Sequence, residues 1–204
     1  MIKYVIFYSI IFIIIEIVFN SILISENILI LEYQDVFSTS RIESLLEFRE
    51  RWLWLTYLIK LILKLISIFV VSLIIYLGLY LSNFQIRLLR VFQIVILAEF
   101  IFFVPIVFKI LWFLLNPFSF DAFQNFNPLS LYSLFNPDLL QEWLSYPFKV
   151  LNLFEVAYWV LLAFLLARYL KKSIDSMLKI VLGYYVSFLF CWVVFVMFIS
   201  LGNS

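Results

Sequence analysis

Residues 53–82 read LWLTYLIKLILKLISIFVVSLIIYLGLYLS, and no charged residue occurs between Leu65 and Leu81. A bilayer core of about 30 Å is crossed by about 20 apolar residues of helix. The stretch therefore predicts a membrane-spanning helix. Ser40-Arg41-Ile42-Glu43 precedes it, and this capping-box pattern predicts that the helix starts well before the membrane.

Four more stretches have the length and apolar character of a span, at residues 4–24, 91–115, 150–170 and 178–201. We interpret the first as a retained helix and not a signal peptide, because Glu16 interrupts it and no A-x-A cleavage pattern follows. Pro105 predicts a local kink in the third. The sequence thus predicts an all-α integral membrane protein, a bundle of about five transmembrane helices forming a single domain over residues 1–204.

The composition excludes several classes of function. Hydrophobic residues make up 66% of the chain and charged residues 13%, whereas soluble domains carry about 25% charged residues. There is no histidine, a single cysteine and only 3 glycines, and no GxGxxG, GxxxxGK or HExxH motif occurs. We therefore expect no enzymatic activity, no cofactor and no metal site. The net charge of +1 also predicts no nucleic-acid partner.

Basic residues near the ends of the spans predict the orientation. Seven fall on one side of the membrane: Lys3, Arg87, Arg90, Arg168, Lys171, Lys172 and Lys179. Four fall on the other side: Arg41, Arg49, Arg51 and Lys149. This difference predicts a cytoplasmic N-terminus and a periplasmic C-terminus, with a bacterial inner membrane as the expected location.

The loop at 116–149 is unusually apolar and aromatic for a solvated segment. Asn-Pro recurs in it at 116–117, 127–128 and 136–137, and each pair is a turn or helix-start signal. We expect short helices near 128–135 and 137–145. Helices lying in the membrane interface and a re-entrant cover packed on the outer ends of the bundle are both compatible with the pattern.

Ionisable residues inside the spans are the candidate functional site, because charge in the membrane is costly and often functional. They are Glu16, Lys60, Lys64, Glu99, Lys109 and Glu155, joined by Asn152 on the polar stripe of the fourth span. At 1.5 Å per residue, four of them lie roughly 9–12 Å below the outer boundary. Lys64 and Glu99 lie deeper.

Three roles remain open for this charge layer. Its members could form ion pairs that fix helix register, with lysines snorkelling outward. They could line a polar or proton-linked cavity that opens outward, or they could pair with a partner's transmembrane helix. A pair between Lys60 and Glu155 is one expected contact. On the fifth span, Tyr184, Ser187 and Cys191 form a weaker polar stripe that we expect to face the bundle.

Residues 151–190, LNLFEVAYWVLLAFLLARYLKKSIDSMLKIVLGYYVSFLF, resemble the Yip1-like family of small polytopic membrane proteins. Leu151-Asn152-Leu153-Phe154 and Trp159 match the family's asparagine–aromatic helix start, and Arg168–Lys172 match its short basic turn. Glu155 stands where the family tends to have an uncharged residue. The resemblance implies a non-enzymatic role in membrane trafficking or complex assembly and supplies no catalytic residues.

These observations favour an accessory or scaffold subunit of a larger membrane complex, in bacterial protein export or in the biogenesis of membrane complexes. Its expected partners are other integral membrane proteins and membrane lipids. The alternative is a transporter or channel component that uses the buried glutamates and lysines.

Overall fold

The computed structural model describes residues 2–23, 30, 37–116, 120–136 and 140–202, with the side chains of Phe120, Asp121 and Glu142 excepted. Five of its helices are long and apolar enough to cross a membrane, and the described residues form no strand beyond one isolated bridge. The predicted all-α bundle is therefore confirmed. The spans are built from α1 (Ile2–Leu23), α3 (Thr39–Leu81), α4 with α5 (Leu88–Glu99 and Phe103–Leu115), α8 (Leu153–Leu170), and α9 with α10 (Ile174–Ile180 and Ser187–Gly202).

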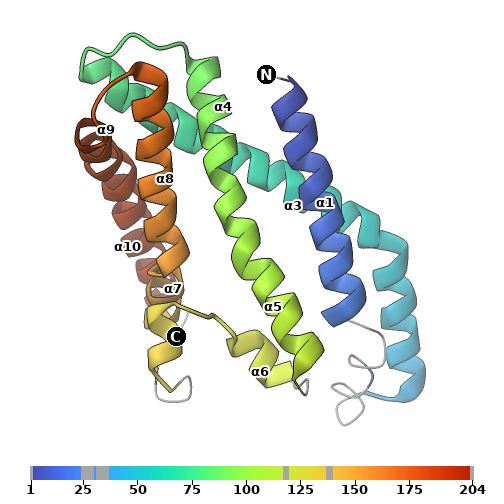
Figure 1. The fold of residues 1–204 in the computed structure, drawn as a ribbon. Helices are drawn as coiled ribbons and strands as arrows, with labels where there is room; N and C mark the ends of the chain where they lie inside the picture. The colour runs from blue at the N-terminus through green and yellow to red at the C-terminus, as the bar shows by residue number, and fades with distance from the viewer. Residues whose placement is uncertain (1, 24–29, 31–36, 117–119, 137–139, 203–204) are drawn as a thin grey trace.

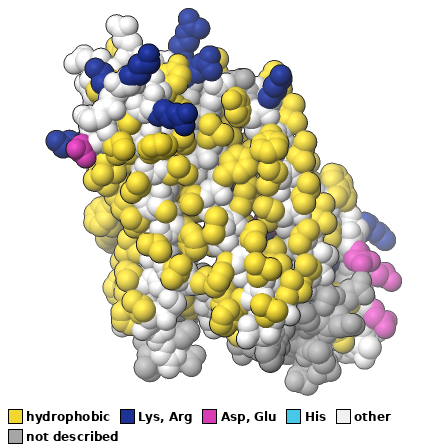
Figure 2. Space-filling view, in the orientation of Figure 1, with side chains coloured by type: hydrophobic (Ala, Val, Ile, Leu, Met, Phe, Trp, Pro, Cys, Tyr) yellow, Lys and Arg dark blue, Asp and Glu magenta, His cyan; other side chains and the backbone are white. Residues whose placement is uncertain are grey.

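Successive spans run in opposite directions, so α1 and α4–α5, the first and third spans, lie side by side in the same direction (Figure 1). The start of α1, the α3–α4 turn and the α8–α9 turn lie at one end of the bundle. We call this the basic end, because the dark-blue lysine and arginine side chains gather there in Figure 2. The short helices α6 (Phe120–Asn125) and α7 (Glu142–Val150) lie at the opposite end, which we call the loop end.

The core lies where α4 packs between α3 and α8. Helix α1 contacts α3, α4 and α5, and α9 packs on α8. Fully buried side chains from each of these layers meet there, among them Tyr8, Ile68, Val95, Leu162 and Met177. Helix α3 crosses behind the other spans on a diagonal (Figure 1). Its 43 residues therefore contact α1 near the middle, at Lys60, and α9 near the C-terminal end, at Gly78.

Near Pro105, where the sequence predicts a local kink, the helix changes type. Residues Phe100–Phe102 form a 3₁₀ turn (η1) between α4 and α5. The proline ring would clash with the carbonyl four residues earlier, at Ile101, and proline has no N–H to donate. The helix re-forms at Phe103, which places Pro105 in the first turn of α5, where a missing N–H costs least.

A π-helical turn, Val181–Val186 (η4), connects α9 to α10. The Ser187 hydroxyl bonds to the carbonyl five residues back, at Leu182 (3.4 Å). The wider turn shifts which residues face inward, so Tyr185 is buried, whereas Ser187 and Cys191 are exposed. The prediction that Tyr184, Ser187 and Cys191 face the bundle holds for Tyr184, which packs against Gly78 of α3. It is wrong for Ser187 and Cys191, because it assumed a regular 100° step through this segment.

Helix α3 begins well before the apolar stretch, as predicted, but not through the predicted capping box. It starts at Thr39, and its N-cap is Ser38, whose side chain makes no capping hydrogen bond. Ser40 already lies inside the first turn. A serine caps a helix only from the non-helical position before it, so the Ser40–Glu43 motif cannot act as a box here.

The segment between α5 and α8 contains α6, a 3₁₀ turn at Leu131–Leu134 (η2) and α7. The expected helix near 128–135 corresponds to η2, and α6 was not expected. Of the expected helix at 137–145, residues 137–139 lie outside the described residues, and α7 begins only at Glu142. Phe123 and Phe126 pack against Phe113 of α5, and α7 packs on α10. This packing agrees with a cover over the loop end of the bundle.

Candidate functional site

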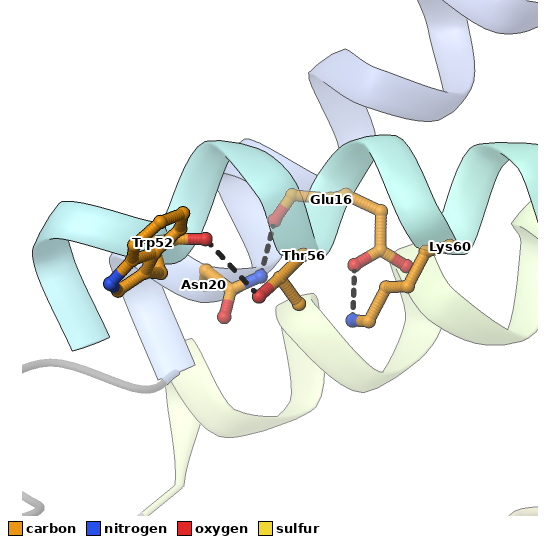
Figure 3. Close-up of polar contacts among 5 residues, drawn as sticks. All are labelled: Glu16, Asn20, Trp52, Thr56 and Lys60. Carbon is orange, nitrogen blue, oxygen red and sulfur yellow. Dashed lines mark hydrogen bonds and ion pairs between the residues drawn. The ribbon is translucent and has the colours of Figure 1, made fainter. Parts of the chain in front are cut away.

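Glu16 of α1 and Lys60 of α3 form an ion pair, with Lys60 Nζ 2.7 Å from Glu16 Oε2 (Figure 3). The Lys60 side chain is 44% exposed and that of Glu16 is 15% exposed. One turn along α1, Asn20 donates from Nδ2 to the Glu16 carbonyl. The expected pair between Lys60 and Glu155 is therefore wrong. Equal depth along two helices does not say which helices are neighbours, and α3 packs on α1.

Lys64 lies one turn further along α3 and pairs with Glu99 at the end of α4. Its Nζ lies 2.6 Å from Glu99 Oε2 and 5.0 Å from the centre of the Phe102 ring. Glu99 is one of the few buried charged residues among the described part of the chain. The Lys64–Glu99 pair thus joins two central helices at the level of the η1 turn.

Lys109 of α5 has a different environment from the other two membrane lysines. Its Nζ donates to the carbonyl of Phe123 (2.6 Å) and lies 4.0 Å from the centre of that ring. Both contacts come from α6, so the lysine connects the end of α5 to the cover. No described carboxylate lies within ion-pair distance of it.

Glu155 sits in the first turn of α8, where its carboxylate is held by two donors. Its Oε1 accepts from Trp159 Nε1 (2.9 Å) and from Tyr185 Oη (2.8 Å). Asn152 is the N-cap of the same helix, and its Oδ1 accepts from the Glu155 backbone N–H (2.8 Å). The two residues on the predicted polar stripe of the fourth span do face the interior, but through these local bonds and not through a lysine.

Three buried tyrosines, Tyr8, Tyr158 and Tyr185, which the sequence did not single out, pack in the same part of the core as Glu99 and Glu155. The Tyr158 ring lies 5.0 Å from that of Phe102 and 5.5 Å from that of Tyr185 (centre to centre). Tyr8 packs on Phe103 and Phe100. The hydroxyls of Tyr8 and Tyr158 have no hydrogen-bond partner among the described residues. With 12 tyrosines in the chain, residue type alone could not single these out.

The charge layer is thus divided among separate places. Glu16–Lys60 and Lys64–Glu99 are ion pairs within the chain, Glu155 is bonded to the aromatic side chains of α8 and η4, and Lys109 is bonded to the cover. The described residues contain no group of three or more Cys, Asp or Glu side chains that could hold a metal ion. The arrangement fits the interpretation in which most of these charges fix helix positions.

Two hollows lie beside Glu155 and Lys109. The larger, of about 530 Å³, is lined by leucines of the cover and of the α8 start together with Val156, Trp159 and Glu155. The smaller, of about 260 Å³, contains Lys109 and Lys149. Ser130 and Asn152 line both. A third hollow, of about 650 Å³, lies at the basic end and contains Arg87 and Arg90.

Comparison with known proteins found no match to the chain among protein-family models, curated proteins or solved structures.

Proposed function

We propose that the chain is a non-enzymatic accessory or scaffold subunit that works through lateral contacts with other integral membrane proteins. A bacterial inner membrane, with protein export or the biogenesis of membrane complexes as the process, is the setting we propose. The basic end would then face the cytoplasm, which places the N-terminus inside and the C-terminus in the periplasm. The resemblance of residues 151–190 to Yip1-like proteins is compatible with this role.

The observation that carries the proposal is the exposure of α10. None of its 16 residues is buried, whereas α1, α3, α4–α5, α8 and α9 all contribute buried residues to the bundle. Lipid accepts apolar side chains, so hydrophobicity alone does not indicate a partner. Ser187 and Cys191, however, place small side chains one turn apart on an exposed face, and small residues let transmembrane helices approach closely.

The pairing of the membrane charges supports the same conclusion. A transport site needs ionisable groups that a substrate or proton can reach and exchange with. Four of the six charged candidates already neutralise one another in pairs. Their arrangement supports a fixed bundle that presents one helix to a neighbour.

The test is a native purification of the tagged chain in mild detergent, followed by mass spectrometry of what copurifies. We expect at least one integral membrane protein in stoichiometric amount. Substituting Ser187 and Cys191 together by phenylalanine should release it, because the enlarged side chains separate the two helices while facing away from the chain's own core. A homomeric species with nothing bound would contradict the proposal.

The matched control is the substitution of Ile10 and Ile14 by phenylalanine. These residues are also exposed and one turn apart, on α1, so the double variant places the same two phenylalanines on an exposed face of a different helix. The copurifying protein should remain bound. Loss of the partner from both variants would indicate a general disturbance of the bundle and would remove the support for α10 as the contact surface.

A transporter or channel component is the second candidate, and one observation favours it. The buried hydroxyls of Tyr8 and Tyr158 lack partners among the described residues, and Tyr158 lies within electrostatic range of both Glu99 and Glu155. Buried polar groups are normally hydrogen-bonded to protein or to ordered water. Water bound along a proton path would supply the partners that these two hydroxyls need. Proton flux into vesicles that contain the purified chain, abolished by Glu155→Gln and retained in Glu16→Gln, would support this candidate over the first.

A further inference from the structure

The two hollows at the loop end share one wall with a defined backbone structure. Ser130 and Asn152 form an isolated antiparallel bridge, in which Leu131 N–H donates to Leu151 and Leu153 N–H donates to Leu129 (2.9 Å each). The Ser130 hydroxyl is bonded to the Asn127 carbonyl, and the Asn152 amide to the carbonyls of Lys149 and Val150. These bonds fix the wall, so both hollows are formed before any ligand arrives.

The two hollows differ in chemistry on either side of this wall. The larger is an apolar groove whose leucines are Leu129, Leu131, Leu134, Leu151 and Leu153. The smaller is lined by Lys109 and Lys149, together with Asn127 and Asn152. Lys109 Nζ donates to the Phe123 carbonyl, and Lys149 Nζ lies 4.5 Å from the centre of the Tyr132 ring. Among the residues that the structure describes, no carboxylate lines the smaller hollow.

We propose that this pair of hollows binds one anionic phospholipid, with its phosphate between Lys109 and Lys149 and an acyl chain in the leucine groove. Two like charges beside one hollow are stabilised by an anion, and hydrogen bonds to charged groups are among the stronger ones in proteins. The volumes of about 530 and 260 Å³ lie within or just below the usual range for small-ligand sites, about 300–1,000 Å³.

The depth of Lys109 along α5 and the position of Glu155 also fit an anionic phospholipid. Lys109 lies six residues before the end of α5 at Leu115, which at 1.5 Å per residue is about 9 Å of helix. A lysine at this depth reaches the headgroup region by extending its side chain. Glu155 lines the apolar groove and not the lysine hollow, so its charge disfavours the reverse placement, with the phosphate in the groove.

The experiment measures lipid retention by native mass spectrometry after reconstitution into vesicles of equal parts phosphatidylglycerol and phosphatidylcholine. We expect one phosphatidylglycerol to remain on the wild-type chain in preference to phosphatidylcholine. Lys109→Gln with Lys149→Gln should reduce that preference about a hundredfold, since two charged bonds are lost and each is worth about one factor of ten in affinity. The matched control, Arg168→Gln with Lys179→Gln at the basic end, should leave the preference unchanged.

Two further measurements keep the proposal falsifiable if the double lysine variant does not fold. Leu134→Gln and Leu153→Gln alter exposed groove residues and should lower retention without changing the core. Glycerol phosphate, which has the headgroup chemistry and no acyl chain, should not displace the bound lipid at equal concentration. Equal retention of both lipids by the wild-type chain would overturn the proposal, as would full displacement by glycerol phosphate.

Discussion

Lys64 Nζ on α3 lies 2.6 Å from Glu99 Oε2 on α4, and the Glu99 side chain is only 4% exposed, against 28% for Lys64. Loss of the pair would therefore be more costly for the buried Glu99 carboxylate than for the partly exposed Lys64 ammonium. A buried charge that loses its partner keeps its desolvation cost without the compensating attraction. The pair fixes α3 against α4 at the centre of the bundle, next to the break at η1.

Replacing Lys64 alone should destabilise the protein much more than replacing both partners. We expect Lys64→Met to lower the free energy of unfolding by about 3 kcal/mol, because Glu99 is left buried and unpaired. Lys64→Met with Glu99→Gln should recover a large part of that loss. Unfolding in mixed micelles, followed as a double-mutant cycle, gives the coupling between the two sites. Simple additivity of the two single losses would contradict the role assigned to the pair.

Lys60→Met is the matched control for that cycle, on the same helix one turn away. The Lys60 side chain is 44% exposed, so without its partner it can extend along the helix toward the membrane surface. We expect a correspondingly small change in the free energy of unfolding. A loss as large as that of Lys64→Met would show that exposure of the side chain does not distinguish the two pairs.

Gly78 should tolerate no larger side chain, because α3 and the π turn approach closely there. A Cβ atom built on Gly78 would lie 2.6 Å from Tyr184 Cδ2 and 2.7 Å from its Cγ. We expect Gly78→Ala to destabilise the protein by about 1–3 kcal/mol, the usual cost of overpacking. In a Tyr184→Ala background the same substitution should cost much less. Thermal unfolding in detergent measures both.

Gly183→Ala is the control for this effect, one residue from Tyr184 in the same turn. Nothing lies within 4 Å of the added Cβ there. Alanine restricts the unfolded chain more than glycine does, so we expect no loss of stability and a gain of up to about 1 kcal/mol. A loss equal to that of Gly78→Ala would mean that the π turn rejects any substitution, and the contact with Tyr184 would not be the cause.

The lengths and number of the spans could be predicted from the sequence because they follow from local composition alone. The stretch around Leu65–Leu81 has to be helical and apolar whatever packs against it. The break at Pro105 was predictable for the same reason, since the missing N–H is a property of one residue. The similar level predicted for Glu16 and Lys60 along their helices agrees with the ion pair between them.

What could not be predicted depends on which helices are neighbours. The partner of Lys60 is Glu16 and not Glu155 because α3 packs on α1, and no count of residues along a helix contains that information. The π turn at Val181–Val186 shifts the inward face from Ser187 to Tyr185. The π turn can be recognised only in the structure, because its sequence VLGYYV resembles that of an ordinary α-helix.

The cap of α8 provides a prediction about local structure. Asn152 accepts the Glu155 N–H and is the N-cap, so Asn152→Ala should cost about 1 kcal/mol. Asn152→Asp keeps the accepting oxygen but loses the amide bonds to the Lys149 and Val150 carbonyls, so it should recover only part of the loss. Ser38→Ala is the control, because Ser38 caps α3 without a side-chain bond and its loss should be near zero. Equal losses for Asn152→Ala and Ser38→Ala in thermal unfolding would contradict the distinction.

The two donors to Glu155 lead to the last prediction. Tyr185 Oη and Trp159 Nε1 both bond to Glu155 Oε1, and hydrogen bonds to a charged group contribute about 1.5–3 kcal/mol. We therefore expect Tyr185→Phe to lower the free energy of unfolding by an amount in that range. In a Glu155→Leu background the same substitution should cost little, because the hydroxyl then has no carboxylate to lose. Tyr80→Phe, at an exposed position of α3, should have no effect in either background. If Tyr185→Phe costs the same with and without Glu155, the hydroxyl stabilises the fold through some other contact, and the carboxylate is held in place by Trp159 alone.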